Sequence, residues 1–400
     1  MRGRGSKADL RLLHGIKVLE VSHAVAGPTA SQVLADYGAD VIKIERPGGG
    51  DMFRDTPGMG PSMFLAVNRG KKSAVIDLKK SAGIRLFYEL VRVSDIIVEN
   101  MGPQVAERLG ITYRKIKSVN PRAIYCRIES FGKGPYKNVP AFDPVLQAAV
   151  GIMSTTGFPP DNFVRAGISV VDVSAGLHAA SGIFALLYRR KLTGKGGQLE
   201  VSLYDAASYF MSYWIARYDL YKNDTTPLGT GHVFGAPYNL FKTKDGFVYI
   251  AVAADKAWVS FCESLGFLDL LSMDAYRTNA KRVKRKKELE KIISGRIRLF
   301  SATKVVRRLM NSGVPISRLN TVKSLLKDPH FKATGTLKEY AYLGSRFRTT
   351  VNPTIVDGAR QFTRNSPPKL GSDTRAVLMT SLGMKRRQIE SLEKNGVISI

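Results

Sequence analysis

The strongest constraint on the fold lies near the N-terminus, where a strand pattern, a helix pattern and a second strand pattern follow one another almost without gaps. The segment KVLEV at 17–21 predicts a short buried strand, 28–37 predicts a helix that starts at a proline and ends at Gly38, and 41–45 predicts the second strand. Such a unit crosses over with a right hand and puts the loop after its first strand at the carboxyl edge of a parallel sheet, where ligands bind. The loop 23–27 lacks the G-x-G-x-x-G spacing, so neither a nicotinamide nor a flavin cofactor is indicated.

The same alternation continues and predicts a doubly wound, Rossmann-like α/β domain. Its further strands are expected at 73–78, 95–99, 123–128 and 198–203, and its helices at 80–93, 142–153, 172–190 and 206–221. The segment 47–68 is rich in Gly, Pro and Met. We expect it to be a long loop at the ligand-binding edge, able to cover a site.

The length of 400 residues exceeds what one hydrophobic core usually serves, so a second domain is expected. The polar stretch 222–231 predicts a linker, and the hairpin pattern that follows it, with helices to about 327, predicts a smaller α+β domain. We therefore divide the chain into 1–224, the first part of a large domain, 225–328, the small domain, and 329–400, a return segment and C-terminal arm that complete the large domain. From Asn352 the arm shows little regular pattern until PPKLG, and a last helix is expected to begin near Thr374.

Composition excludes several classes of protein. With 44% hydrophobic and 24% charged residues, the chain has the composition of a globular protein. The first ten residues are basic but have no apolar core, so they do not form a secretory signal, and the longest apolar helix candidate, 182–188, is expected to be too short to span a membrane. Cys126 and Cys262 lack metal-ligand spacing, which predicts no metal and a cytoplasmic, reducing location.

The net charge of +28 has a local source. Between 281 and 308, twelve basic residues stand against the two acids Glu288 and Glu290. Such a run forms either a solvated helix face or a nucleic-acid contact, and no zinc-finger spacing, RNA-recognition motif or interleaved aromatic pattern supports the second. The general basicity favours anionic ligands such as phosphorylated cofactors and carboxylates.

One acid stands alone in the segment RAGISVVDVSAGLHAASGIFALLYRR. Asp172 is flanked by Val170, Val171 and Val173 and precedes a helix pattern rich in small residues. Local rules favour an N-cap, because Asp accepts hydrogen bonds from the first N–H groups of a helix. The alternative is a nucleophile, and the two roles are compatible, since the helix dipole would lie beside a working carboxylate.

The chain resembles the family III CoA-transferases, which include formyl-CoA:oxalate and carnitine-type transferases and, as a relative, α-methylacyl-CoA racemase. The resemblance covers nearly the whole chain in the family's order. It rests on AGPTASQVLADYGADVIKIERPGGGD, NRGKKSAVIDL, DIIVENMGP with ERLGI, FDPVLQAAVGIMSTTG, VVDVSAGLHAASGIFALL, LYRRKLTGKGGQLEVSLYDAA, APYNLFKTKDGFVYIAV and PPKLGSDTRAVL.

The resemblance implies an acyl-CoA:carboxylate CoA-transferase in which Asp172 matches the catalytic aspartate. That residue attacks the acyl-CoA carbonyl to give a mixed anhydride, which the CoA thiolate converts to an aspartyl-CoA thioester before the acceptor carboxylate reacts. Water must be excluded because the anhydride would hydrolyse. A glycine-bearing loop shields the site in some transferases, and its counterpart here is GTGHVFG, which lacks an uninterrupted glycine run and contains Gly229, Gly231, His232 and Gly235.

The resemblance also implies that coenzyme A is bound as part of the acyl-CoA substrate. The matching positions follow the predicted strands and are Ala24, Val25, Arg46, Ile76, Lys79, Asn100, Met101, Gly102 and Arg108. Arg46, Lys79 and Arg108 are expected to meet the adenosine phosphates. Val25 and Pro140 stand where the formyl-CoA enzyme carries a glutamine and a lysine, which makes oxalate or formate a poor candidate substrate.

Two alternatives remain beside the transferase. Racemisation needs a general base on each face of the α-carbon, and the racemases carry a histidine where this chain has Phe142, so we rank the transferase higher. Of the five histidines, His178 lies in the helix predicted after Asp172 and His232 in the predicted shielding loop. A basic nucleic-acid-binding protein on an enzyme-like fold is the third hypothesis. The resemblance further implies an interlocked homodimer with no membrane partner.

Overall fold

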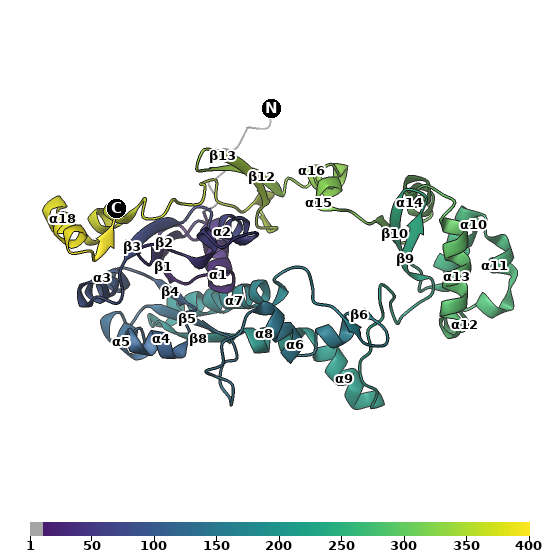
Figure 1. The fold of residues 1–400 in the computed structure, drawn as a ribbon, viewed down its shortest axis with the longest axis horizontal. Helices are drawn as coiled ribbons and strands as arrows, with labels where there is room; N and C mark the ends of the chain where they lie inside the picture. Colours follow the sequence, from purple (N-terminus) through teal and green to yellow (C-terminus); the bar gives the residue numbers. More distant parts are fainter. Residues whose placement is uncertain (1–10) are drawn as a thin grey trace. The chain divides into compact units, whose positions relative to one another are not determined.

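The computed structural model describes residues 11–400, and Figure 1 shows their ribbon. The chain divides into two compact units. The first comprises the chain up to Ile152, Ala166–Lys222 and Ala333–Ile400. The second comprises Met153–Arg165 and Asn223–Lys332.

The first unit is built on a seven-stranded sheet with the order β16-β3-β2-β1-β4-β5-β8 (Figure 1). Its strands are β1 (Lys17–Val21), β2 (Asp40–Glu45), β3 (Lys72–Ile76), β4 (Ile96–Glu99), β5 (Ile124–Glu129), β8 (Gly197–Ser202) and β16 (Ile398–Ser399). Neighbouring strands are parallel except β16, which pairs antiparallel with β3. The order reverses at β1, between β2 and β4, which makes the carboxyl ends of β1 and β4 a topological switch point. The predicted α/β class is confirmed.

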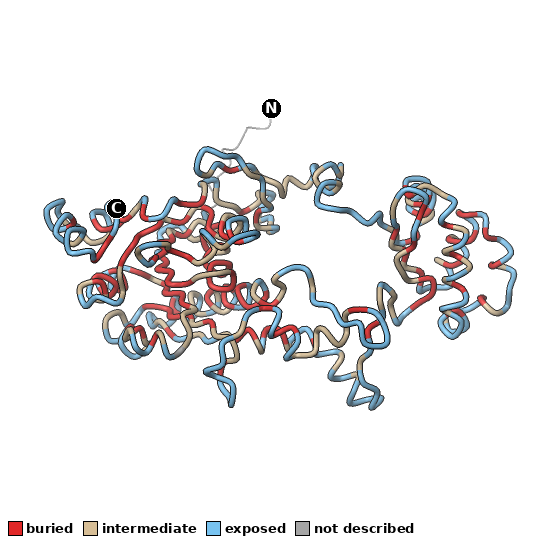
Figure 2. Tube along the Cα trace, viewed as in Figure 1, coloured by how far each residue is buried: buried red, intermediate tan, exposed pale blue. Residues whose placement is uncertain are grey.

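Helices cover both faces of this sheet, and alternate residues of a strand point to opposite faces. The helices are α1 (Ala26–Asp36), α2 (Gly60–Val67), α3 (Ser81–Arg92), α4 (Pro103–Arg108), α5 (Tyr113–Val119), α6 (Asp143–Ala149), α7 (Val170–Thr193), α8 (Leu203–Phe210), α9 (Ser212–Tyr221), α17 (Thr374–Leu382) and α18 (Arg386–Lys394). Leu19 faces a core shared with α3, α5, α17 and α18, whereas Val18 faces one shared with α1, α6, α7 and α8. Figure 2 shows the buried residues gathered in the strands and the inner helix faces.

The helix α7 differs from its prediction. It has 24 residues, and by length and composition it could cross a membrane, so the expectation that the longest apolar helix is too short is wrong. Its small residues serve packing inside the unit: a Cβ on Gly176 would lie 2.7 Å from the carbonyl oxygen of Ala26, and one on Gly182 would lie 2.7 Å from Leu199. Together with its contacts to β5 and β8, this close approach identifies α7 as a core helix.

Three further expectations need correction. The segment 47–68 is not a continuous loop, because it contains the 3-10 helix η1 (Met52–Arg54) and α2. The helix expected at 206–221 is divided at Met211 into α8 and α9. The C-terminal part contains more structure than the expected last helix, namely β12 (Leu337–Tyr342), β13 (Ser345–Thr350), β14 (Ile355–Val356), β15 (Ala359–Arg360), α18 and β16.

Contacts within the chain order the C-terminal arm. The backbone N–H of Ser73 donates to the carboxylate of Asp373 at 3.0 Å, and that of Val75 donates to the hydroxyl of Thr374 at 3.0 Å. The strand β16 then extends the large sheet beyond β3. A segment with little pattern of its own is therefore held by the edge of the sheet.

The second unit has a three-stranded antiparallel sheet in the order β11-β10-β9, packed against helices. Its elements are η2 (Met153–Thr155), β6 (Gly157–Phe158), β7 (Asn162–Phe163), β9 (Tyr238–Thr243), β10 (Gly246–Ala251), α10 (Asp255–Leu265), α11 (Leu268–Ser272), η3 (Asp274–Tyr276), α12 (Asn279–Lys284), α13 (Lys286–Ile297), α14 (Ala302–Asn311), β11 (Ile316–Arg318), α15 (Val322–Leu325) and the start of α16 (Pro329–Ala333). Its core holds Trp258, Phe261 and Cys262. Both cysteines of the chain are free and buried.

Candidate active site

Two loops meet at the switch point of the large sheet, one after β1 and one after β4. The side-chain oxygen of Asn100 accepts the backbone N–H of His23 at 2.9 Å, and its amide nitrogen donates to the carbonyl oxygen of His23 at 2.9 Å. Ala24 follows in the left-handed region, with φ of 63°, which is uncommon for a residue other than glycine. The predicted positions Ala24, Val25 and Asn100 therefore come together at one edge of the sheet, and Met101 and Gly102 continue the second loop.

The three predicted phosphate contacts are exposed cations in the first unit. Arg46 directly follows β2, and its Nε donates to the carbonyl oxygen of Gly50 at 3.1 Å. Lys79 follows β3, and Arg108 is the last residue of α4. The remaining predicted position, Ile76, differs from these because its side chain is 1% exposed and packs in the core.

Asp172 lies in the first turn of α7 but is not its N-cap, which is Ser169. The capping carboxylate belongs to Asp143 at the start of α6, whose Oδ2 accepts the N–H of Val171 at 2.7 Å and the N–H of Asp172 at 3.2 Å. Gln147 donates to the other oxygen of Asp143, and its own Oε1 accepts the N–H of Ala166 at 2.8 Å. The N-cap interpretation of Asp172 is therefore wrong, and its carboxylate is available for another role.

The surroundings of Asp172 make its carboxylate more basic than an ordinary aspartate. Its side chain is partly exposed, and within residues 11–400 its carboxylate accepts no hydrogen bond and forms no ion pair. Burial raises the pKa of Asp172 to about 7, and the negative charge of Asp143 adds to the rise. Perturbed carboxylates of this kind are typical of functional sites, and a more basic carboxylate is a stronger nucleophile.

The packing of α7 on α1 brings Asp172 close to the loop after β1. Gly176 contacts the carbonyl oxygen of Ala26, the first residue of α1 and the neighbour of Val25. Asp172 precedes Gly176 by four residues and so lies on the same side of α7, about 6 Å along its axis. The packing thus places the first turns of α7 beside the start of α1, the helix that follows the predicted CoA-binding loop.

The flanking valines give Asp172 only part of the expected dry surroundings. Val171 is fully buried, Val170 is half-buried, and Val173 is 40% exposed. Phe142, which stands where racemases carry histidine, is 63% exposed and has no group that could carry a proton. His178 is exposed on α7 and meets the ring of Tyr209 edge-on at 5.5 Å.

The predicted shielding loop belongs to the second unit, whereas Asp172 belongs to the first. The ring of His232 stacks on Tyr238 at 4.7 Å, and its carbonyl oxygen accepts a hydrogen bond from Lys286 at 2.5 Å. Gly229 has φ of 61°, and a Cβ on Gly235 would lie 2.4 Å from the carbonyl oxygen of Val252. Gly231 lies between them. These contacts fix the loop to its own unit.

The basic run 281–308 is not a uniform surface. Arg282 is fully buried, donates from Nε to the carbonyl oxygen of Ala236 at 2.8 Å and lies over the ring of Trp258. Four others pair with acids: Lys281 with Asp274, Arg285 with Glu288, Lys286 with Glu290, and Arg296 with Asp269. Part of the run therefore stabilises the second unit.

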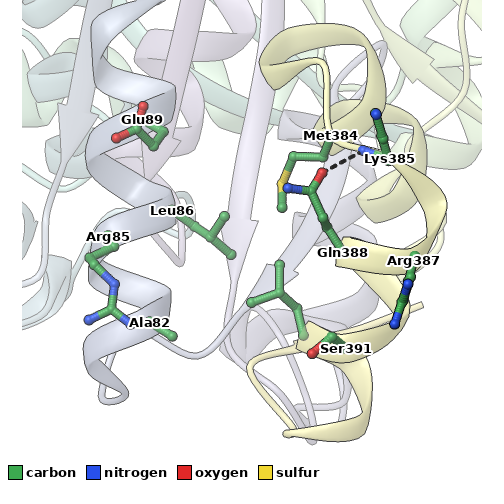
Figure 3. A pocket seen from close by; sticks show the side chains of 10 residues that line it. Ala82, Arg85, Leu86, Glu89, Met384, Lys385, Arg387, Gln388 and Ser391 are labelled. Carbon is green, nitrogen blue, oxygen red and sulfur yellow. Dashed lines mark hydrogen bonds between the residues drawn. The ribbon is translucent and has the colours of Figure 1, made fainter.

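Two hollows of the first unit lie away from these residues. Figure 3 shows the one between α3 and α18, with a volume of about 660 Å³, where the N–H of Lys385 donates to Gln388 at 2.8 Å. The other, of about 1300 Å³, lies at the amino ends of β1, β2 and β3. None of the predicted site residues lines either hollow. Among residues 11–400, no three His, Cys, Asp or Glu side chains gather as metal ligands.

Sequence similarity establishes the class of protein to which this fold and site belong. The chain is a CoA-transferase enzyme, and it belongs to CoA-transferase family III, whose sequence profile matches residues 13–374. The family resemblance found in the sequence motifs is thereby confirmed.

Several relatives match nearly the whole chain. The human succinyl-CoA:glutarate CoA-transferase is 32% identical over 412 residues, which cover 99% of this chain and 92% of that protein. The succinate–glutarate CoA-transferase of Agrobacterium fabrum is 32% identical and covers 92% of this chain and 94% of its own length. A formyl-CoA:oxalate CoA-transferase of Rhodopseudomonas palustris is 30% identical, with 96% of this chain and 97% of that protein covered.

Solved structures agree with the fold. A CaiB/BaiF family protein from Brucella suis matches with a TM-score of 0.84 and 30% identity over 92% of this chain and 99% of that chain. A protein from Mycobacterium tuberculosis matches with a TM-score of 0.81 and 27% identity over 91% of this chain and 98% of that chain.

Sequence reasoning missed the residues that support the site. Asp143 and Gln147 hold the start of α7, and Lys43 and Asp51 hold the loop after β1 through contacts described below. A signal was present for Lys43, because a lysine between two isoleucines of a buried strand must find a charged partner inside the fold. The role of Asp143 depends on a contact between separate helices, which no local pattern announces.

Proposed function

We propose that this enzyme transfers CoA from an acyl-CoA to a carboxylic acid through covalent intermediates on Asp172. The observation that carries the proposal is the state of this carboxylate: within residues 11–400 it accepts no hydrogen bond, and its pKa is raised to about 7 by burial and by the negative charge of Asp143. Asp172 lies one helical turn before Gly176, which packs against Ala26 at the start of α1. Above that pH it is an anion with its lone pairs available for attack.

In the first half-reaction, a carboxylate oxygen of Asp172 attacks the thioester carbonyl, and the carbon–sulfur bond breaks. The products are a mixed anhydride on Asp172 and the CoA thiolate. The thiolate then attacks the aspartyl carbonyl carbon and releases the donor's carboxylate, which leaves an aspartyl-CoA thioester. Each step exchanges one activated acyl bond for another, so the energy of the thioester is conserved.

The second half-reaction runs the same chemistry in reverse order. The acceptor carboxylate attacks the aspartyl-CoA thioester and displaces the CoA thiolate, which gives a second mixed anhydride. The thiolate attacks the acceptor's carbonyl carbon, so that the new acyl-CoA forms and Asp172 returns as a carboxylate. No net proton is taken up or released.

We propose that acyl-CoA binds across the carboxyl ends of β1 to β4. The loops that carry Ala24, Val25, Asn100, Met101 and Gly102 would receive the pantetheine arm. The exposed cations Arg46, Lys79 and Arg108 would pair with the adenosine phosphates, to which guanidinium and ammonium groups are suited.

For the substrates we propose succinyl-CoA as donor and a dicarboxylate such as glutarate as acceptor. The proposal follows the names of the human and Agrobacterium relatives. The departures at Val25 and Pro140 argue against oxalate, and the net charge of +28 favours an acceptor that brings a second carboxylate.

We also propose that the enzyme is an interlocked homodimer. No residue of α9 is buried, although Tyr213, Ile215, Tyr218, Leu220 and Tyr221 are large apolar or aromatic side chains. A helix of this composition is normally covered, and a symmetric partner is the simplest cover.

The test is transfer of CoA from succinyl-CoA to glutarate by the wild type and by Asp172→Asn. The asparagine keeps the size of the side chain but cannot form an anhydride, so we expect activity to fall by about 10⁴-fold or more. Asp274→Asn, an exposed acid of the second unit that pairs with Lys281, is the matched control and should keep wild-type activity. Undiminished transfer by Asp172→Asn would contradict the proposed mechanism.

A further inference from the structure

Four charged side chains form a fully buried cluster beneath the loop after β1. Glu20 lies on β1, Lys43 on β2, Lys71 just before β3 and Asp51 at the start of η1. Each of the four side chains is 0% exposed. Two ammonium groups and two carboxylates balance one another, so the cluster carries no net charge.

Each ammonium group has its own set of partners. Nζ of Lys43 lies 2.7 Å from Glu20 and 2.9 Å from Asp51. Nζ of Lys71 lies 2.8 Å from the second oxygen of Glu20 and donates to Asn68 at 2.9 Å. Burial alone would raise the pKa of Glu20, but the two lysines outweigh it and hold that pKa at about 2. Glu20 is therefore ionised and pairs with both lysines.

Lys43 holds the loop after β1 from two sides. Its Nζ donates directly to the carbonyl oxygen of Ser22 at 2.8 Å. Through Asp51 it reaches the next turn of the loop, because Oδ1 of Asp51 accepts the N–H of Ala24 at 3.3 Å. These two contacts bracket His23 and fix the point at which the backbone enters the left-handed conformation of Ala24.

The same pair ties this loop to the one after β2. Oδ1 of Asp51 also accepts the N–H of Phe53 at 3.0 Å, and the N–H of Asp51 donates to Glu45 at 2.8 Å. Arg46 begins that second loop and donates to Gly50, the neighbour of Asp51. The ion pair of Lys43 and Asp51 thus joins the segments that carry Ala24 and Arg46.

A buried ion pair is a poor device for stability alone, since apolar side chains of similar volume often serve a fold equally well. Ala24 without its restraint would leave the left-handed region, where a side chain is strained. We propose that Lys43 and Asp51 are positioning residues that hold the loop after β1 in the conformation that receives acyl-CoA, an inference that rests on the proposed function. Lys71 supports α1 instead, because its third contact is the carbonyl oxygen of Pro28 at 3.0 Å.

Calorimetric titration measures the Kd for CoA in two single variants, Asp51→Asn and Asn68→Ala, and in the double variant described in the next paragraph. Asp51→Asn keeps the size of the side chain but loses the ion pair with Lys43, and we expect the Kd for CoA to rise at least about tenfold. In a turnover assay, KM for acyl-CoA should rise with it, while kcat at saturation changes by less than about threefold. Asn68→Ala disturbs the Lys71 side of the same cluster, so it should lower thermal stability and leave the Kd within about twofold of wild type.

A rescue separates positioning from general loss of structure. Glycine adopts positive φ without strain. Adding Ala24→Gly to Asp51→Asn should therefore lower the Kd for CoA by at least about threefold relative to Asp51→Asn alone. A purely structural role for Asp51 predicts no recovery, because the cluster stays broken.

Hydrogen exchange of the unliganded wild type tests the same idea without any substitution. If Lys43 and Asp51 hold the loop, the peptide that contains Ala24 is protected before CoA is added. Rapid exchange that slows only with CoA would overturn the inference, as would an Asp51→Asn protein that is folded and binds CoA as tightly as the wild type. A wild type that binds no CoA at all would overturn the proposed function as well.

Discussion

The carboxylate of Asp143, at the start of α6, accepts the backbone N–H of Asp172 at 3.2 Å. Two acids with different roles therefore meet at the first turn of α7. Asp143 is buried and satisfies the N–H groups of the helix terminus. Asp172 has neither those hydrogen bonds nor a cation, and it lies in the negative field of its neighbour. The arrangement raises the basicity of Asp172 and assigns the capping role to another residue.

The wild type should lose activity as the pH falls through about 7, because the pKa of Asp172 is raised to about 7 and only the anion attacks. The profile of kcat/KM against pH should show a single acidic limb near that value. The control Asp274→Asn should give the same acidic limb as the wild type. A rate that stays constant down to pH 5 would mean that a different nucleophile reacts.

Asp143→Asn should move this acidic limb to lower pH, because loss of the neighbouring negative charge lowers the pKa of Asp172 toward its ordinary value. The rate on the alkaline plateau should fall, since the nucleophile is less basic. The amide nitrogen that replaces one oxygen cannot accept a hydrogen bond, so either Gln147 or the start of α7 loses its acceptor and the fold should be destabilised by about 1 kcal/mol. The limb position in the pH profile and a urea titration measure the two effects separately.

Asp172→Asn should be more stable than the wild type at pH 8 by about 2 kcal/mol, with allowance for the partial exposure of the side chain. The carboxyl group of Asp172 ionises near pH 4 in the unfolded chain but near pH 7 in the folded chain, because its pKa is raised by folding. The wild type therefore loses stability as the pH rises between these values, and the loss is complete above pH 7. The gain should therefore shrink as the pH falls from 7 toward 4 and disappear below the pKa of the unfolded chain. Equal stability of the two proteins at pH 8 would show that the folded state does not disfavour the anion.

Gly176→Ala should separate α7 from α1, since the added Cβ would lie 2.7 Å from the carbonyl oxygen of Ala26 and 2.7 Å from Cβ of Thr29. We expect a loss of stability of about 1–3 kcal/mol and a higher KM for acyl-CoA, because Ala26 adjoins the loop after β1. Gly295→Ala in α13 is the matched control: its Cβ would meet nothing within 4 Å, so the helix should gain about 0.5–1 kcal/mol. Chemical unfolding and steady-state kinetics measure both.

Arg108→Gln should weaken binding of CoA but not of a truncated thioester that lacks the adenosine phosphates, because the guanidinium would meet only those phosphates. We expect the Kd for CoA to rise by about fivefold or more. Arg92→Gln, an exposed arginine of α3 paired with Glu89, controls for loss of one positive charge. Equal effects of Arg108→Gln on CoA and on the truncated thioester would remove Arg108 from the phosphate site.

Much of the first unit could be predicted because its signals are local. The strand at 17–21 coincides with β1, since Val18, Leu19 and Val21 give this short segment the apolar content of a buried strand. The prediction failed where the structure depends on distant partners. The two-residue strand β16 exists only because β3 offers an open edge, and the break at Met211 has no glycine or proline to announce it.

The candidate site shows the same division. The solitary position of Asp172 was visible in the sequence, but its local setting favoured an N-cap, and only the family resemblance pointed to a nucleophile. The capping residue, Asp143, comes from a different helix, so the sequence gives no reason to pair them. The ion pair of Lys43 and Asp51 likewise forms between β2 and the start of η1, and no local sequence pattern pairs these two residues.

The most direct test of a covalent mechanism is to trap Asp172 during turnover. The enzyme is mixed with succinyl-CoA and then with hydroxylamine or borohydride, and its peptides are analysed by mass spectrometry. The covalent mechanism predicts a hydroxamate or a reduced side chain at Asp172. This modification should require the acyl-CoA and should be absent from Asp172→Asn. Full turnover with an unmodified Asp172, or with the label on another residue, would contradict it.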